Sequence, residues 1–296
     1  MFQLQGIVPP LVTPLNEDET IDEAGLERQL SRLLDAGVHG IFFLGTTGEQ
    51  PALRDAERVK SIRLAKGIVN GRVPLIVGTM ASSTARAIDH IREAEREGAD
   101  AVAVTPPYYY LSRGPEDQIP HYQACAAATG LPVVIYNIPS TTKVALAPAT
   151  IARIAEIENV KGVKDSSADM AQFLGILSLL RDQPNFGCMV GAPVLAGPAL
   201  LFGASGVVPA ISNIDPQTLL NIYASALAGN NTGLVRLQER VHKLLAIAAL
   251  GSPIVCFKTA LELMGICRHY TTAPLQPLSP EKREALAAIL RELELL

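Results

Sequence analysis

Residues 73–105 read VPLIVGTMASSTARAIDHIREAEREGADAVAVT. This stretch begins with the apolar run VPLIVG and ends with a second apolar run, AVAVT. Between them, residues 84–97 form an amphipathic segment, with Thr84 as the predicted N-cap and Gly98 just after the last turn. A strand, a helix and a second strand in this order predict two parallel strands joined by a crossover helix.

The same alternation recurs along most of the chain. Apolar, β-branched runs that stop at small or polar residues occur eight times, at residues 6–12, 40–44, 73–78, 101–105, 132–136, 160–164, 187–190 and 206–209. Because these runs are continuously apolar, both faces of each strand are expected to be covered. Eight such units predict an α/β fold, the (β/α)8 TIM barrel. An open doubly wound sheet is the alternative, but the G-x-G-x-x-G turn expected after its first strand is absent.

Amphipathic segments fill the intervals between these runs. Residues 23–36 carry leucines at helical spacing, and residues 148–157 begin with a proline suited to a first helical turn. After the eighth run, further helices are predicted at residues 216–227, 233–250, 252–265 and 280–296. We therefore expect a catalytic barrel over residues 1–212 and a helical extension over residues 213–296. No Gly/Ser-rich or Pro-rich linker separates them, so they are expected to form one structural unit.

Composition limits the possible partners. The 296 residues are 48 % hydrophobic and 18 % charged, with a net charge of −4 and no run of Lys or Arg, so no nucleic-acid partner is expected. No stretch of about 18 uninterrupted apolar residues occurs, and the first residues lack a signal-peptide pattern, so no membrane partner is expected. The four cysteines show no C-x-x-C spacing. We expect reduced thiols in a cytoplasmic protein.

Active sites of such barrels lie at the carboxyl ends of the strands. Polar residues follow four of the predicted strands there, in the segments GTTGE at 45–49, TPPYYY at 105–110, YNIP at 136–139 and KDSS at 164–167. These segments therefore contain the candidate catalytic residues.

Lys164 is the most unusual of these residues, because lysine is seldom buried in an apolar strand unless it is paired or used. Burial would disfavour its ammonium form and supply the neutral amine that attacks a carbonyl. The alternative is a lysine that pairs with Asp165 or extends to the barrel mouth. Tyr136 ends the preceding strand, where its phenol could pass protons to and from a substrate oxygen, or could be an ordinary packed tyrosine.

The turn at residues 45–48 offers hydroxyl and backbone N–H groups that suit a carboxylate, or it is simply a turn capped by threonine. Glu49 is expected to tie this turn down rather than to act as a base. The five histidines show no metal-binding spacing, so no metal is expected. The small-residue segments at 191–193 and 203–206 could hold a phosphate, but no Lys or Arg lies nearby.

Together, four motifs resemble the dihydrodipicolinate synthase / N-acetylneuraminate lyase family. They are G-T-T-G-E at 45–49, T-P-x-Y-Y at 105–109, Y-N-I-P at 136–139 and G-V-K-D at 162–165. Their order and spacing match along nearly the whole chain, including the C-terminal helices. The resemblance implies a class I aldolase, a lyase in which a lysine forms a Schiff base with a 2-oxo acid such as pyruvate.

The resemblance also implies roles for individual residues. Lys164 would be the Schiff-base lysine and Tyr136 the proton relay. Thr46 would hydrogen-bond Tyr136. Tyr108 would complete the relay from a neighbouring subunit, and Tyr109 is the alternative. Members of the family are commonly homotetramers built from tight dimers, so a homotetramer is expected.

The substrate-binding residues follow from the same resemblance. Thr47 and the backbone N–H groups of its turn would hold the carboxylate of pyruvate. The carbonyl of Val208 would face the bound pyruvate. The full set expected to bind substrate is Thr47, Gly48, Thr141, Gly191 and Val208. No cofactor is expected.

Two departures from the family pattern limit the substrate. Thr141 occupies the position where dihydrodipicolinate synthases usually carry an Arg for the carboxylate of aspartate semialdehyde, and threonine has no charged, bidentate fork. Lys143 could substitute only as a point charge. Neuraminate lyases carry acidic residues after the strand-seven glycine, whereas Gly191 is followed here by the apolar residues 192–194. A large polyhydroxylated substrate is therefore disfavoured.

These departures predict reversible cleavage of a shorter aldol to pyruvate and an aldehyde. The expected substrate is a 2-oxo-3-deoxy sugar acid or a compound of the 4-hydroxy-2-oxoglutarate type. The alternatives are a 4-hydroxy-tetrahydrodipicolinate synthase or a dehydratase acting through the same imine. An alternative of another class is a catalytically silent ligand-binding protein on this fold.

Overall fold

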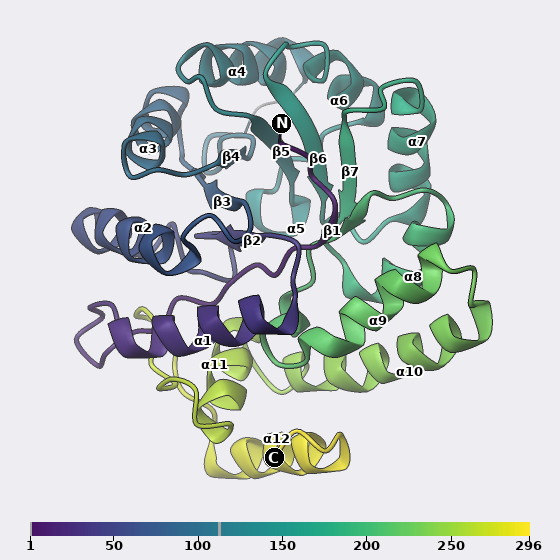
Figure 1. The fold of residues 1–296 in the computed structure, drawn as a ribbon. Coiled ribbons are helices and arrows are strands. Elements are labelled where there is room, and N and C mark those ends of the chain that lie inside the picture. Colours follow the sequence, from purple (N-terminus) through teal and green to yellow (C-terminus); the bar gives the residue numbers. More distant parts are fainter. Residues whose placement is uncertain (1, 112–113) are drawn as a thin grey trace.

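The computed structural model describes residues 2–111 and 114–296. Within these residues, eight strands form one parallel sheet in the order β1-β8-β7-β6-β5-β4-β3-β2. The strands are β1 (Gly6–Ile7), β2 (Ile41–Phe43), β3 (Leu75–Gly78), β4 (Ala101–Val104), β5 (Val133–Asn137), β6 (Val160–Asp165), β7 (Gly187–Val190) and β8 (Gly206–Val207). Figure 1 shows the helices following one another around the outside of this sheet.

The sheet closes on itself between β1 and β2. Pro10 and Phe42 form a parallel bridge, and the Phe42 N–H donates to the Pro9 carbonyl at 2.9 Å. The predicted (β/α)8 barrel is therefore confirmed. The first strand is shorter than its predicted range of 6–12, because Pro9 and Pro10 have no N–H to donate to a neighbouring strand.

Helices cover the outer face of the barrel. They are α1 (Glu23–Ala36), α2 (Asp55–Val69), α3 (Thr84–Arg96), α4 (Pro115–Ala127), the short α5 (Pro139–Thr142), α6 (Pro148–Ile154), α7 (Met170–Leu180) and α8 (Ala196–Leu201). α1 has the predicted bounds, and α6 ends three residues before the predicted Ile157. The N-cap of α3 is Ser83 rather than Thr84, because the extended Ser83 accepts the Arg86 N–H while Thr84 is already helical.

Two separate apolar clusters lie on the two faces of the sheet. In β4, Ala101 and Ala103 belong to one cluster and Val102 and Val104 to the other, as expected from the alternation of side chains along a strand. The larger cluster packs between strands and helices. The smaller fills the barrel interior and consists of Leu4, Val8, Phe42, Ile76, Met80, Ala101, Ala103, Val134, Tyr136, Ile138, Met189 and Val208.

Leu4 closes the barrel at the amino ends of β6 and β7. A Cβ atom on Gly162 would lie 2.5 Å from Leu4 Cδ2, and one on Gly187 would collide with the Leu4 carbonyl oxygen. Glycine at these positions therefore lets the N-terminal segment enter the barrel. The polar segments described above lie at the opposite end, where the strands have their carboxyl ends.

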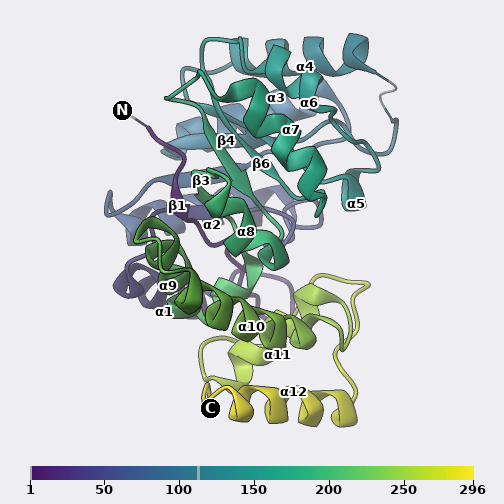
Figure 2. The ribbon, with the colours of Figure 1, turned by 90° about the vertical axis from the view of Figure 1, so that its right-hand side faces the viewer.

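The C-terminal part adds α9 (Pro216–Leu227), α10 (Asn231–Ala248), α11 (Pro253–Leu263) and α12 (Pro280–Glu292). Figure 2 shows α10, α11 and α12 in successive layers on one side of the barrel. The predicted boundary after residue 212 falls inside a short 3-10 helix, Ala210–Asn213, and stays a prediction. Within the described residues, no single helix is long and apolar enough to cross a membrane. α10 and α11 pass that test as a pair by length and composition, with a 104° bend between them.

Candidate active site

Lys164 extends from β6 into the barrel interior. Its side chain is 5 % exposed, and its Nζ lies 4.3 Å from the centre of the Phe42 ring and 3.9 Å from the centre of the Tyr136 ring. Burial lowers the pKa of Lys164 well below its ordinary value, and no charged group within the described residues counters this shift. Cation–π attraction to the two rings favours the ammonium by only about 0.5–2 kcal/mol, less than the several kcal/mol that burying a charge costs. Burial therefore favours the neutral amine over the ammonium.

Asp165 is not the partner of Lys164, so the pairing alternative is wrong. Its carboxylate accepts the Asn137 Nδ2 at 2.6 Å and the Ser167 hydroxyl at 2.5 Å. Consecutive residues of a strand face opposite sides of the sheet, so Asp165 points out of the barrel while Lys164 points in. The carboxylate ties the ends of β5 and β6 together and leaves the lysine unpaired.

Tyr136 lies beside Lys164 on the neighbouring strand, in direct register with it. Its hydroxyl lies 3.2 Å from Thr46 Oγ1, which brings the end of β5 to the turn after β2. Burial raises the pKa of Tyr136 to about 12, although side-chain hydrogen bonds to Thr46 and Ser166 act in the opposite direction. Tyr136 is therefore a phenol, not a phenolate, at neutral pH.

Ser166 also belongs to this cluster and is not among the predicted site residues. It lies two residues after Lys164 and faces the same side of the strand. Its hydroxyl interacts with Tyr136, and a Cβ atom on Gly191 would collide with Ser166 Oγ and lie 3.1 Å from Lys164 Cε. The alternation of side chains along β6 was the signal that could have identified it.

Gly191→Ala should lower kcat/KM by about tenfold or more, because the added methyl group displaces Ser166 and crowds the Lys164 side chain. Steady-state kinetics would measure this loss. The matched control is Gly67→Ala in α2, where a Cβ atom meets nothing within 4 Å. The control should keep full activity and gain about 0.5–1 kcal/mol in stability. Equal kcat/KM in both variants would show that Gly191 does not shape the site.

In the turn at residues 45–48, some backbone polar groups are already hydrogen-bonded within the protein and others are not. The Gly48 N–H donates to the Gly45 carbonyl at 3.0 Å, and the Gly48 carbonyl accepts the Thr13 hydroxyl at 2.7 Å. Gly48 therefore shapes the turn, and its N–H is already used. The backbone N–H groups of the half-buried Thr46 and Thr47 have no acceptor within the described residues, so these two can bind an anion.

Glu49 ties this turn to the C-terminal extension, in keeping with the predicted role of tying the turn down. Its Oε2 accepts the Thr272 N–H at 2.7 Å and the Thr272 hydroxyl at 2.8 Å, and its Oε1 lies 2.5 Å from Lys258 Nζ. The glutamate is 3 % exposed. This burial and these contacts suit a structural role better than that of a base.

The remaining candidates lie around the barrel mouth. Tyr108 is half-buried and packs against the interior cluster. Tyr109 is 79 % exposed and has a φ of 79°, which is unfavourable for a non-glycine residue. Val208 is buried directly after β8. Thr141 is exposed on α5, outside the contacts that join the lysine, the tyrosine and the turn.

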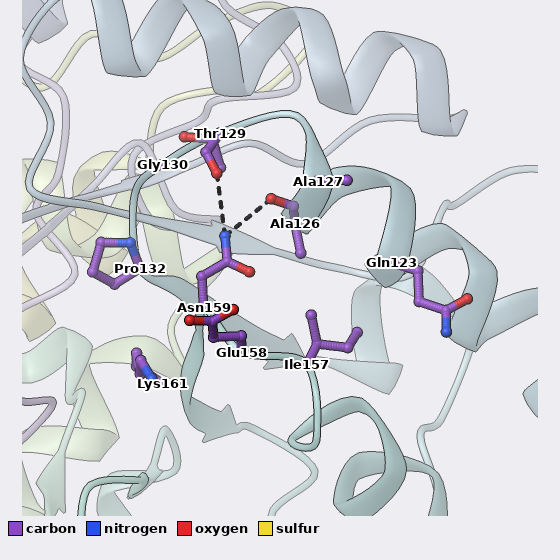
Figure 3. Close-up of a pocket in the computed structure, with 10 residues that line it drawn as sticks. All are labelled: Gln123, Ala126, Ala127, Thr129, Gly130, Pro132, Ile157, Glu158, Asn159 and Lys161. Atoms are coloured by element: carbon purple, nitrogen blue, oxygen red, sulfur yellow. Dashed lines mark hydrogen bonds between the residues drawn. The ribbon is translucent and has the colours of Figure 1, made fainter.

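A cavity of about 640 Å3 lies at the opposite end of the barrel, at the amino ends of β5 and β6. Figure 3 shows Asn159 between α4 and the strands. Its Nδ2 donates to the carbonyls of Ala126, Thr129 and Leu131 at 2.9, 3.2 and 3.3 Å. The amide is thus used to hold the backbone, and the cavity is remote from Lys164. It is not part of the active site.

Comparison with known proteins agrees with this geometry. Residues 3–293 match the family model described as the dihydrodipicolinate synthetase family. The chain belongs to this family. It is 36 % identical to an uncharacterized DapA-like lyase of Halobacterium salinarum, over 99 % of this chain and 95 % of that protein. It is 32 % identical to the 4-hydroxy-tetrahydrodipicolinate synthase of Methanothrix thermoacetophila, over 98 % and 97 % of the two chains.

Solved structures of the family superimpose closely. Dihydrodipicolinate synthase from Bacteroides thetaiotaomicron gives a TM-score of 0.94 at 36 % identity, covering 99 % of this chain and 100 % of that one. YagE from E. coli K12, solved in complex with pyruvate, gives 0.95 at 28 % identity, covering 99 % of each chain. The expected family and fold are confirmed. The protein is an enzyme, a Schiff-base lyase of this family, and the silent-protein alternative is set aside.

Proposed function

We propose that this lyase cleaves a short 2-oxo acid aldol reversibly to pyruvate and an aldehyde, with Lys164 as the Schiff-base lysine. The observation that carries the proposal is the buried, unpaired amine of Lys164 beside the phenol of Tyr136. Burial favours the neutral, nucleophilic form of such an amine. The proposed substrate is a 2-oxo-3-deoxy sugar acid or a compound of the 4-hydroxy-2-oxoglutarate type.

In the proposed reaction, Lys164 Nζ attacks the C2 carbonyl of the substrate, and loss of water gives the protonated imine. The imine draws the electron pair of the C3–C4 bond as that bond breaks, which yields an enamine and the aldehyde. Tyr136 takes the proton of the C4 hydroxyl and passes its own proton toward Thr46, since its phenol is not ionised beforehand. The same proton then returns through Tyr136 to C3 of the enamine, and addition of one water hydrolyses the resulting imine and releases pyruvate.

The carboxylate of the substrate is proposed to bind at the turn. The unpaired N–H groups of Thr46 and Thr47, together with the Thr47 hydroxyl, are the donors available there. Gly191 and the Val208 carbonyl would line the pyruvate moiety from β7 and β8. Gly48 supports this arrangement through the backbone contacts that shape the turn.

We further propose that the enzyme is a homotetramer in which a tyrosine from a neighbouring subunit completes the relay at Thr46. Tyr109 suits this role better than Tyr108, the residue that the motif spacing favours. Tyr108 packs against its own barrel, whereas Tyr109 projects into solvent. Its positive φ costs about 1–3 kcal/mol and is the kind of strain that persists at functional positions.

The aldehyde half of the substrate is proposed to lack a second carboxylate at the aspartate-semialdehyde position. Thr141 carries no charge, and the Lys143 ammonium donates to the Ser140 carbonyl at 2.6 Å. Residues 192–194, after Gly191, are Ala, Pro and Val and cannot hydrogen-bond a polyol through their side chains. Both features support a short aldehyde rather than the partner used by the named synthases.

A panel of 2-oxo acids tests this proposal by enzyme-coupled detection of pyruvate. We expect rapid pyruvate release from one of the two proposed substrate classes. Condensation of pyruvate with aspartate semialdehyde should be about 10- to 100-fold slower, since a hydrogen bond to a charged group contributes about 1.5–3 kcal/mol. Thr141→Arg should recover part of this condensation. Efficient condensation by the unaltered enzyme would assign a synthase, and loss of water with the carbon chain intact would assign a dehydratase.

A further inference from the structure

We propose that Lys258, in the C-terminal helix α11, is a positioning residue for the reaction, because through Glu49 it holds the turn that receives the substrate carboxylate. The two side chains form an ion pair of 2.5 Å, with exposures of 0 % for Lys258 and 1 % for Glu49. Lys258 Nζ also donates to the Tyr270 carbonyl at 2.7 Å. The pair thus joins the helical extension to the barrel in the protein interior.

The connection from Lys258 reaches the catalytic groups in few steps. The backbone N–H of Glu49 donates to the Thr46 carbonyl at 3.1 Å, and the Thr46 hydroxyl lies 3.2 Å from that of Tyr136. Any rotation of Glu49 would therefore move the Thr46 backbone, whose N–H is one of the donors available to an anion. Thr13 holds the same turn from its other side through the Gly48 carbonyl.

Glu49 needs such a restraint because its backbone is in the left-handed region, with a φ of 60°. A non-glycine residue keeps this conformation only where its surroundings fix it. The carboxylate is fixed on both oxygens, by Lys258 on Oε1 and by Thr272 on Oε2. Removal of the lysine leaves one oxygen buried without a partner, and the side chain then gains by turning toward solvent.

Stability alone does not account for an ion pair at this place. Burying two charges is costly, and apolar residues of similar volume often stabilise a fold equally well. The ion pair instead restricts the Glu49 side chain to one orientation, and this in turn restricts the turn to one geometry. A displacement of about 1 Å in a binding group can cost about 10²-fold in rate, so this geometry matters to the reaction.

This inference rests on the proposed function in one respect, the assignment of the turn to the substrate carboxylate. It predicts that Lys258→Met raises the pyruvate concentration needed for half-maximal borohydride trapping at Lys164 by about tenfold or more. The effect on kcat at saturating substrate should be smaller, because Lys258 touches neither the lysine nor the phenol. Both quantities are to be measured well below the melting temperature of each variant.

Two variants make the test specific. Lys243→Met removes the lysine of an exposed ion pair with Glu292 in the same extension and should leave trapping unchanged. The double variant Glu49→Gln/Lys258→Met has no uncompensated buried charge and keeps an acceptor for Thr272, so it should fold and should lie between Lys258→Met and the unaltered enzyme. If Lys258→Met does not fold, the double variant takes its place in the comparison with the unaltered enzyme. The inference would be overturned if the folded Lys258→Met and double variants were trapped at the same half-maximal pyruvate concentration as the unaltered enzyme. Lower melting temperatures of these variants would not alter that conclusion. Failure of the unaltered enzyme to be trapped by pyruvate would instead overturn the proposed function.

Discussion

Lys164→Met should abolish turnover and prevent borohydride trapping of pyruvate on the β6 peptide. The loss of activity should be about 10⁴-fold or more, since methionine offers no nucleophile to form the imine. Mass spectrometry of the trapped protein and steady-state kinetics would measure both effects. The matched control is Lys161→Met on the same strand, which lies at the amino end of β6, away from the site. Trapping in the Lys164 variant, or its loss in the Lys161 variant, would remove Lys164 from the reaction.

The same substitution should stabilise the ligand-free protein at neutral pH. The unfolded chain has the ordinary lysine pKa of 10.5, and burial lowers the pKa of Lys164 in the folded chain. At a pH between the folded-state pKa and 10.5, the unfolded chain therefore binds one more proton than the folded chain. Lys164 therefore costs stability as the pH falls below 10.5, by up to about 1.4 kcal/mol per pH unit, until the folded-state pKa is reached. Methionine removes this cost and fills the same apolar space. Urea unfolding of both proteins should show an advantage for Lys164→Met at pH 7 that shrinks toward pH 10.

A buried ammonium stabilised by the two aromatic rings would give the opposite result. The variant would then be less stable than the parent at pH 7. The difference would persist to higher pH, because the pKa of the lysine would not be depressed. The comparison thus separates a nucleophile kept neutral by burial from a structural cation.

The barrel, and the grouping of the candidate residues Lys164 and Tyr136 inside it, could be predicted from sequence because their signals are local. Continuous apolar runs mark strands covered on both faces, and Lys164 and Tyr136 are anomalous within such runs at the ends where barrels carry their sites. The range 6–12 was too long because Pro9 and Pro10 have no N–H to donate, so that only an isolated bridge to Phe42 continues the pairing beyond Ile7, and apolar character does not show this. Ser166 could be read from alternation along β6, but its contact with Gly191 depends on how closely β7 approaches.

Other features depend on contacts that sequence order hides. Thr272 and Glu49 are 223 positions apart in the sequence. Nothing in the sequence around Lys258 indicates a role, because its contact with Glu49 arises only from the packing of α11 against the turn. Our preference for Tyr109 over Tyr108 rests on the exposure of its ring, 79 %, and on its φ of 79°, neither of which the sequence reveals. The spacing of the motif favours Tyr108, with Tyr109 as the alternative.

Tyr136→Phe should retain imine formation with pyruvate but lose about 10²–10⁴-fold in turnover of the aldol substrate. Trapping at Lys164 depends on the amine and on the turn, both of which the substitution leaves in place. Cleavage depends on accepting the C4 hydroxyl proton, which phenylalanine cannot do. Since the pKa of Tyr136 is about 12, its ionisation should not limit the unaltered enzyme between pH 7 and 10.

Tyr122→Phe is the appropriate control for this substitution. Tyr122 is also fully buried, and its hydroxyl donates to the Val104 carbonyl at 3.0 Å on the outer face of β4. Its loss should reduce stability by about 1 kcal/mol and leave turnover unchanged. If Tyr136→Phe behaves in the same way, its hydroxyl is structural and the proton leaves by another route. If turnover falls while trapping persists, the phenol acts in bond cleavage. With a pKa of about 12, Tyr136 does not lose its proton to water at neutral pH, so it can accept the substrate proton only if it passes its own proton to Thr46 at the same time.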